Sequence, residues 1–291
     1  MRCKMEKAII VRYGEIGIKS YWVRREFEKR LTDNICRALL ENKIEIQRIK
    51  QRGARVYIWC KQFKKALKVL RNVFGIVSYS PAYVIKTDLN EIKKLALRIY
   101  KKSKKKKFRI TTRRRFKGFP LTSMQISADI GAYVVEKAKG KVDLENYDIN
   151  INIELNKKQT FVFSEIYKAW GGLPIGTQGK VFCYVSNKRD FVCAFLMARR
   201  GCEVILGGSA KVKKFARRFE KKFYFYEEPL YFIEIDKNIK KIENEAKKFG
   251  AKAIVFSKVN LKERSDLPIF YPLLGFSEKQ IKKILKEMSL D

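Results

Sequence analysis

The sequence predicts an α+β amino-terminal half followed by an α/β domain built on a parallel sheet. Apolar strands and amphipathic helices are mixed over residues 1–168, whereas strands and helices alternate with short connections over 181–291. A glycine-rich segment separates the two patterns. With 291 residues the chain exceeds one typical domain, and its 46% hydrophobic content is ample for packed cores. We therefore expect two or three compact units rather than a disordered basic protein.

The first unit, expected at 1–77, has a two-layer pattern of strands and helices. Apolar residues from Trp22 through Phe27 to Ile35 recur at helical spacing. Gly75 stands where a glycine would end the second helix. The expected elements are a strand at 7–12, the helix that carries Trp22 to Ile35, strands at 44–50 and 54–60, and a helix leading to Gly75.

The second unit, expected at 78–168, has the order β–α–β–α–β–β, which suits a small α/β sheet. The expected elements are a strand near 82–86, a helix at 89–100, a strand at 108–112, a helix at about 123–137, and strands at 149–155 and 160–166.

A linker at 169–180 leads to the third unit, 181–291. Four glycines and a proline lie within residues 171–180, a composition that excludes helix and strand there. The strand–turn–helix unit that follows directs backbone N–H groups at its turn, where a phosphate normally binds. The expected strands are at 181–185, 203–206, 231–235 and 252–256, and the expected helices are near 191–199, 211–221, 238–249 and 277–288.

The charge of the chain points to a polyanionic partner. The formal net charge is +36, from 66 Lys and Arg against 30 Asp and Glu. A thermophile-like surface of ion pairs would explain many charges of both signs but not this excess. RNA or DNA is the simplest partner for such a surface.

Composition also excludes several classes of function. Histidine is absent, which excludes Ser-His-Asp and Cys-His nucleophiles and argues against a catalytic zinc site. The six cysteines form no C-x-x-C pair, so we expect buried free thiols rather than disulfides or metal ligands. No apolar run of about 18 residues and no signal-peptide core is present, so we expect a cytoplasmic protein without a membrane partner.

Short motifs in all three units point to one known family. They are residues 11–16 with Arg24-Arg25-x-Phe27-Glu28, then 119–123, 130–131, 142–148 and 161–163, and finally 171–180, 199–204 and 265–275. In order and spacing, they resemble the tRNA 4-thiouridine synthetase (tRNA sulfurtransferase) family. The resemblance covers almost the whole chain. It implies a ferredoxin-like domain, a THUMP RNA-binding domain and an adenine-nucleotide-hydrolase-like domain with a pyrophosphatase loop.

A basic run at 101–117 is the first candidate for RNA contact. It holds eleven Lys or Arg and no acid in seventeen residues, and Phe108 and Phe116 interrupt it. Such a surface neutralises several phosphates while guanidinium groups grip individual ones. A solvated surface is the alternative. The resemblance implies that the run binds the single-stranded 3′ end of tRNA. The candidate residues are Lys104, Lys105, Lys106, Lys107, Arg109, Arg113, Arg114, Arg115 and Lys117.

A second basic cluster lies in the first unit. Two basic surfaces on one chain suit tRNA, which spans far more than one small domain, although an ordinary exposed helix face is the alternative. The candidate RNA-binding residues are Arg12, Lys19, Arg24 and Arg25, with Lys29 and Arg30 beside them.

The pyrophosphatase loop departs from the family pattern Ser-Gly-Gly-x-Asp-Ser. Residues 186–191 read Ser-Asn-Lys-Arg-Asp-Phe, so two glycines and the final serine are replaced. We expect the side chains of Asn187, Lys188 and Phe191 to obstruct the approach of a pyrophosphate. No cofactor is therefore expected, and ATP with Mg would bind only if the chain is an active enzyme. The vestigial nucleotide site comprises Tyr184, Val185, Ser186, Asn187, Lys188 and Asp190.

The residues for sulfur transfer also depart from the family. Active members use a cysteine beyond the segment corresponding to 265–275 or a C-x-x-C pair, and no cysteine follows Cys202 here. We expect Cys183 and Cys193 to be packing residues, and we assign no catalytic or metal-binding residue. Gly207-Gly208-Ser209 is expected to be a glycine turn with Ser209 capping a helix, rather than a phosphate cradle.

Three functions remain open at this point. The first is a tRNA-binding protein that acts in or alongside tRNA modification without ATP-dependent catalysis of its own. The second is an active tRNA sulfurtransferase that makes 4-thiouridine, with a partner protein supplying catalysis or sulfur. The third is a general RNA-binding protein. The resemblance also implies a homodimer.

Overall fold

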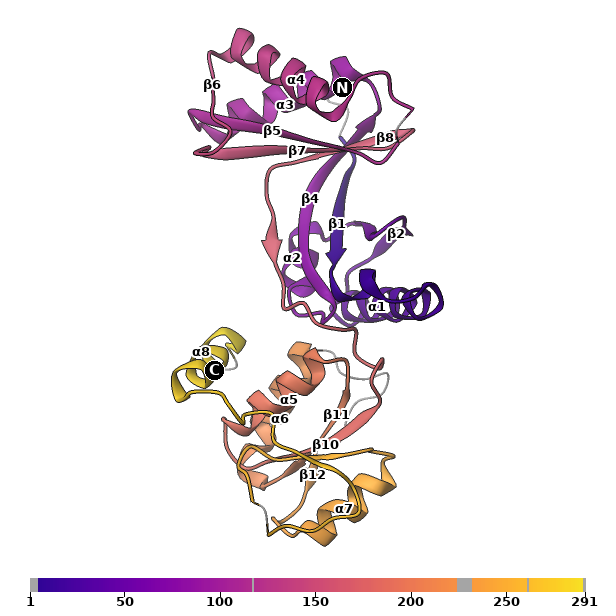
Figure 1. Cartoon of the computed structure of the whole chain (residues 1–291), viewed down its shortest axis with the longest axis vertical. Helices are drawn as coiled ribbons and strands as arrows, with labels where there is room; N and C mark the ends of the chain where they lie inside the picture. Colours follow the sequence, from indigo (N-terminus) through magenta and orange to yellow (C-terminus); the bar gives the residue numbers. More distant parts are fainter. Residues whose placement is uncertain (1–4, 117, 224–231, 261, 290–291) are drawn as a thin grey trace. The chain divides into compact units, whose positions relative to one another are not determined.

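The computed structural model describes residues 5–116, 118–223, 232–260 and 262–289 (Figure 1). The chain forms two compact units, each discontinuous in sequence. Unit 1 comprises Met1–Val11, Gln47–Lys61 and Tyr79–Tyr167, and unit 2 comprises Arg12–Ile46, Gln62–Ser78 and Lys168–Asp291.

A nine-stranded sheet dominates the first 168 residues in the described part of the chain. Its strand order is β2-β3-β1-β4-β8-β7-β5-β6, and β9 pairs with β4. The expected strands are all present, and β6 and β9 are additional. The strands are β1 (Lys7–Tyr13), β2 (Ile46–Gln51), β3 (Arg55–Cys60), β4 (Ile76–Lys86), β5 (Lys107–Arg114), β6 (Lys141–Val142), β7 (Ile149–Leu155), β8 (Gln159–Phe163) and β9 (Tyr167–Lys168).

In unit 1, helices α3 (Leu89–Ser103) and α4 (Ser123–Ala138) pack beside β5 and β7 (Figure 1). Side chains of β5 alternate, so Phe108 and Ile110 are buried against these helices while Arg109 and Arg113 project from the opposite face. This alternation places the side chains of Arg109 and Arg113 away from the core. The apolar core that results includes Ile92, Ile99, Ile126, Ile130, Ile151 and Ile153.

In unit 2, the 3-10 turn η1 (Glu15–Ile18) leads into α1 (Tyr21–Glu41), and α2 (Phe63–Leu70) packs against α1. Phe27, Leu31 and Ile35 are buried, as their spacing predicts. Trp22, which the same periodicity assigned to the apolar stripe, is instead exposed. The buried stripe therefore begins more than one turn after the helix does.

The role expected for Gly75 is wrong. Helix α2 ends at Leu70, and its C-cap residue Arg71 has right-handed helical backbone angles. Gly75 has φ +95°, and its N–H donates to the Gly171 carbonyl at 2.9 Å. A Cβ at Gly75 would lie 3.1 Å from the Pro174 side chain. Glycine is therefore required there for a close approach of two loops.

The carboxyl-terminal part of unit 2 contains a parallel sheet with the order β12-β11-β10-β13-β14. The α/β architecture predicted for 181–291 is thus confirmed, with β14 as an additional strand and residue 231 outside the described residues. The strands are β10 (Lys180–Val185), β11 (Glu203–Gly208), β12 (Ile233–Glu234), β13 (Ile254–Val255) and β14 (Ile269–Phe270).

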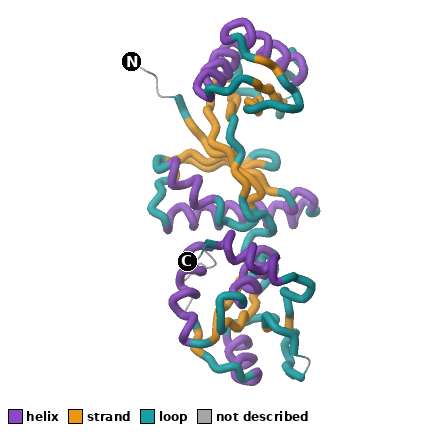
Figure 2. Tube along the Cα trace, turned by 90° about the vertical axis from the view of Figure 1, so that its left-hand side faces the viewer, coloured by secondary structure: helices purple, strands orange, loops and turns teal. Residues whose placement is uncertain are grey.

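Helices cover both faces of this parallel sheet (Figures 1 and 2). One core joins α5, α6 and α8 to Cys183 and Val185, and the other joins α7 to Phe182 and Tyr184. This is a doubly wound arrangement: the chain adds β11 and β12 on one side of β10 and then β13 and β14 on the other side. The order of the strands therefore reverses between β10 and β13. The helices are α5 (Asp190–Arg199), η2 (Ala210–Val212) with α6 (Lys213–Phe223), α7 (Ile239–Lys248) and α8 (Glu278–Met288).

Candidate RNA interface and altered nucleotide site

The basic run of unit 1 divides into two groups at opposite ends of β5. Lys104, Lys105 and Lys106 are exposed in the turn between α3 and β5. Arg113 and Arg115 are exposed at the other end of the strand. At about 3.3 Å per residue, the two groups are separated by roughly 20 Å. They would therefore meet different phosphates of one RNA. Lys117 lies outside the described residues.

Three members of the run are tied to neighbouring loops. Lys107 pairs with Asp143 (Nζ–Oδ2 3.1 Å), and Arg109 Nη1 donates to the Leu144 carbonyl at 3.2 Å. Hydrogen bonds from the Asn146 amide and from Lys107 lower the pKa of Asp143. Arg114 Nη1 donates to the carbonyls of Phe119 (3.2 Å) and Leu121 (2.9 Å). Arg114 therefore holds the segment that contains Phe119 and Leu121, and its contact with RNA stays a prediction.

The exposed arginines at the end of β5 lie beside a buried ion pair. Arg55 of β3 and Glu154 of β7 are 8% and 2% exposed, with Arg55 Nε 3.6 Å from Glu154 Oε1. Burial lowers the pKa of Arg55, Glu154 opposes that effect, and the charges of Arg115 and Arg113 add to it. Arg113 and Arg115 thus add positive charge near a buried guanidinium whose printed carboxylate contact is with Glu154. Such a surplus of positive charge favours binding of an anion such as a phosphate.

The second basic cluster surrounds the start of α1 in unit 2. Arg24 is held by Glu28 (Nε–Oε1 2.8 Å), which also accepts a hydrogen bond from the Tyr13 hydroxyl. Burial and this hydrogen bond raise the pKa of Tyr13 to about 12. Lys19 and Arg25 are exposed, whereas Arg12 is half-buried. Lys19 and Arg25 therefore remain the members best placed to meet a phosphate.

The altered loop between β10 and α5 already uses most of its backbone amides. The amides of Ser186 and Asn187 donate to Asp190 Oδ2 at 2.7 and 3.1 Å, and the Ser186 hydroxyl donates to the same oxygen at 2.9 Å. The Arg189 amide donates to Asn187 Oδ1 at 2.9 Å, and the Asp190 amide donates to the Asn187 carbonyl at 3.2 Å. The amides of Ser186, Asn187, Arg189 and Asp190 therefore have acceptors inside the loop.

Asp190 also links two loops at the place where a doubly wound sheet binds its ligands. Ligands of such sheets bind beyond the carboxyl ends of the strands at the reversal of strand order, which here lies between β10 and β13. The Ser257 hydroxyl, just after β13, donates to Asp190 Oδ1. The buried carboxylate of Asp190 thereby ties together the loops on both sides of the reversal.

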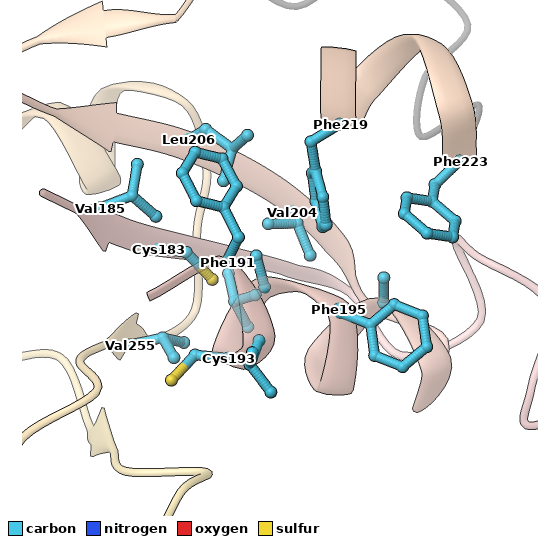
Figure 3. Close-up of a cluster of buried hydrophobic side chains, with 14 of the residues drawn as sticks. Cys183, Val185, Phe191, Cys193, Phe195, Val204, Leu206, Phe219, Phe223 and Val255 are labelled. Carbon is cyan, nitrogen blue, oxygen red and sulfur yellow. The ribbon is translucent and has the colours of Figure 1, made fainter. Parts of the chain in front are cut away.

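Phe191 does not obstruct the loop as the sequence led us to expect. Its ring is fully buried and lies 4.7 Å from the Phe215 ring between centroids. The Phe219 ring lies 5.3 Å away on the same measure, and Figure 3 shows Phe191 and Phe219 in this core. Phe191 therefore lies in the core beneath the loop and leaves the space above the loop open. As a phenylalanine it also lacks the hydroxyl that the family pattern has at this position. Lys188 Nζ lies 5.4 Å from the Phe215 ring centroid. Two other residues of the expected nucleotide site are also buried: Val185 in the core with α5, α6 and α8, and Tyr184 in the core with α7.

The segment 207–209 is not a glycine turn. Gly207 and Gly208 are the last residues of β11. Gly208 has φ +156°, and a Cβ there would lie 1.8 Å from the Val185 carbonyl oxygen. Ser209 does cap the following 3-10 turn, accepting from the Lys211 amide as expected. Glycine is needed at 208 for the close pairing of β10 and β11.

The cysteines of unit 2 near the loop lack reactive thiolates. Cys183, Cys193 and Cys202 are free and buried (Figure 3 draws the first two). Burial raises the pKa of the Cys193 thiol to about 12 and raises the pKa of the Cys183 thiol well above its usual value. The described residues contain no group of His, Cys, Asp and Glu side chains able to hold a metal ion. Nor does any helix among them have the length and apolarity to cross a membrane.

Comparison with known proteins supports the architecture. The ThiI ferredoxin-like domain model matches residues 8–80, and the THUMP domain model matches residues 86–165. The probable tRNA sulfurtransferase of Thermococcus kodakarensis is 37% identical over 335 residues, covering 98% of this chain and 88% of that protein. That of Methanocaldococcus jannaschii is 36% identical over 337 residues, with the same coverage.

Two solved structures have the same fold. The crystal structure of PH1313 from Pyrococcus horikoshii has a TM-score of 0.85 and 32% identity, covering 97% of this chain and 99% of that one. A 4-thiouridine synthetase–RNA complex with bound ATP has a TM-score of 0.82 and 23% identity, covering 98% of this chain and 85% of that one.

The fold and matched domains define a THUMP-containing protein of the tRNA-modification lineage. The chain belongs to the tRNA sulfurtransferase family.

Proposed function

We propose that this protein binds tRNA and acts in or alongside tRNA modification without ATP-dependent catalysis of its own. The observation that carries the proposal is the internally bonded loop at 186–190, whose amides already donate to Asp190 and Asn187. A pyrophosphate would have to break these bonds in order to form its own, so the usual gain from amide–phosphate contacts is lost.

Binding of tRNA is supported by the charge of +36 and by the THUMP match. Within unit 1, we assign phosphate contact to Lys104, Lys105 and Lys106 at one end of β5 and to Arg113 and Arg115 at the other. Within unit 2, we assign it to Lys19 and Arg25. Counterion release from several such contacts makes the affinity fall steeply with salt concentration. We further propose a cytoplasmic homodimer.

An active tRNA sulfurtransferase is the second candidate. Its relatives are named as probable tRNA sulfurtransferases, and Ser186 and Asp190 of the loop motif are retained. In that case ATP with Mg would bind at the loop, and a partner protein would supply sulfur or complete the site. A general RNA-binding protein is the third candidate, because charge alone does not distinguish tRNA from other RNA.

A thiolation assay separates the first two candidates. The purified chain is incubated with unmodified tRNA, Mg-ATP and a persulfide donor, and 4-thiouridine is measured by mass spectrometry of the digested tRNA. We expect no product, because a pyrophosphate would have to break the hydrogen bonds that the loop amides already make, and because Cys183, Cys193 and Cys202 are buried thiols. The double variant Asn187→Gly, Lys188→Gly should also form no 4-thiouridine. Product from the unmodified chain would establish the active enzyme instead.

A further inference from the structure

Two exposed aromatic rings open helix α1 in unit 2. Tyr21 and Trp22 are 65% and 76% exposed, and their ring centroids lie 5.3 Å apart in an edge-to-face arrangement. Ile18, which ends the preceding 3-10 turn, is 85% exposed. Large apolar side chains gathered in this way on a surface mark a binding site more often than isolated ones do.

The rings lie among positive charges. Arg25 donates toward the Tyr21 hydroxyl (Nη1–OH 3.4 Å), and its guanidinium carbon lies 5.8 Å from the Tyr21 ring centroid. Lys19 is exposed two residues before the pair. The first turn of α1 contains no acidic residue, although Glu26 is exposed one turn beyond Trp22.

This combination fits an unpaired nucleobase better than an apolar partner. A base presents a π-face that stacks on an indole or a phenol ring, and its phosphate is attracted by the neighbouring cations. In a duplex the faces of the bases are covered by their neighbours, so only unpaired nucleotides present them. A purely apolar protein surface would leave Lys19 and Arg25 without a complementary charge.

We propose that Trp22 and Tyr21 form a stacking platform for an unpaired base of the RNA that this protein binds, with Lys19 and Arg25 holding the adjoining phosphates. This inference rests on the proposed RNA-binding function and adds a base-contacting site outside the basic run of unit 1. Because every base has a π-face, the platform recognises single-stranded structure rather than a particular sequence.

Three variants test the platform by their affinity for tRNA. Trp22→Ala should weaken binding about 5- to 150-fold, as expected for the loss of one stacked base. Trp22→Phe keeps an aromatic face, so its change in log Kd should be less than half of the change that Trp22→Ala causes. The matched control is Leu40→Ala, because Leu40 is 62% exposed near the other end of the same helix. This control should bind as the unmodified protein does.

The salt dependence distinguishes stacking from charge. Trp22→Ala should leave the slope of log Kd against log salt concentration unchanged, whereas Arg25→Ala should reduce it by about 0.7, the value for one phosphate of a single strand. A second readout is the fluorescence of Trp22. Trp59 is buried and Trp170 half-buried, so Trp22 is the tryptophan most open to quenching. Single-stranded RNA should quench it, an RNA duplex of equal length should not, and Trp22→Phe should abolish the quenching.

An unchanged affinity in Trp22→Ala would overturn the platform while leaving tRNA binding intact. Equal losses in Trp22→Ala and Trp22→Phe without quenching by single-stranded RNA would overturn it too. If the unmodified protein bound no tRNA, the proposed function itself would fail.

Discussion

Replacing Asp190 with alanine is expected to lower the free energy of unfolding of unit 2 by about 3–5 kcal/mol. The carboxylate is 3% exposed and accepts hydrogen bonds from Ser186, Asn187 and Ser257. Without it, several donors at the reversal of strand order would lose their buried acceptor at once. Denaturant unfolding followed by circular dichroism measures the loss as a lower midpoint at unchanged slope.

Two further variants give this result its control. Asp190→Asn keeps the size of the side chain and one acceptor oxygen, so it should cost less than Asp190→Ala. Ser257→Ala removes one donor and leaves the loop bonds intact, so we expect about 1 kcal/mol. A loss below 1 kcal/mol in Asp190→Ala would mean that the carboxylate is not what closes the loop.

Replacing Arg113 and Arg115 together with alanine is expected to weaken tRNA binding about 100-fold at physiological salt. Each guanidinium is exposed beside the Arg55–Glu154 pair, and each lost charged contact with a phosphate costs about 1.5 kcal/mol. Removal of two phosphate contacts should also reduce the slope of log Kd against log salt concentration by about 1.8. Filter binding over a salt series measures both quantities.

The charge-matched control is Arg217→Ala with Arg218→Ala. These two arginines are exposed on α6 in unit 2, so the pair removes the same net charge elsewhere. Equal weakening by both double variants would show that only the overall charge counts and would remove Arg113 and Arg115 from the interface. Arg114 is left unchanged in the test because its guanidinium holds the loop that contains Phe119 and Leu121.

Local periodicity was enough to predict most helices and strands. The alternation in β5 and the helical spacing of Phe27, Leu31 and Ile35 on α1 are properties of neighbouring residues, and the structure agrees with both. The two-residue strands β6, β9 and β14 have too few residues to produce a periodic signal, and they exist because a neighbouring strand pairs with them.

The parts of the site that sequence reasoning missed depend on contacts between distant segments. Arg55 and Glu154 meet only because β3 and β7 are folded into one unit, and nothing near either residue in the sequence signals the pair. Phe191 was expected over the loop because the family has a hydroxyl there. In the structure Phe191 lies on α5, one position after the buried Asp190, and its ring faces Phe215 and Phe219.

Trp22 shows the opposite kind of error. Helical spacing assigned its indole to the core, but only tertiary packing decides where along a helix the buried face begins. The first buried residue of α1 is Phe27, so the first turn is left to solvent together with Ile18. The mismatch between pattern and exposure is what makes the start of α1 a candidate for binding.

A calorimetric titration of Mg-ATP into the protein–tRNA complex tests the central claim most directly. Formation of the complex first establishes that the protein binds tRNA. We then expect only the heat of dilution up to millimolar nucleotide, because the amides at 186–190 already have acceptors in Asp190 and Asn187. A saturable heat with one nucleotide bound per chain would contradict the account and restore the ATP-dependent sulfurtransferase.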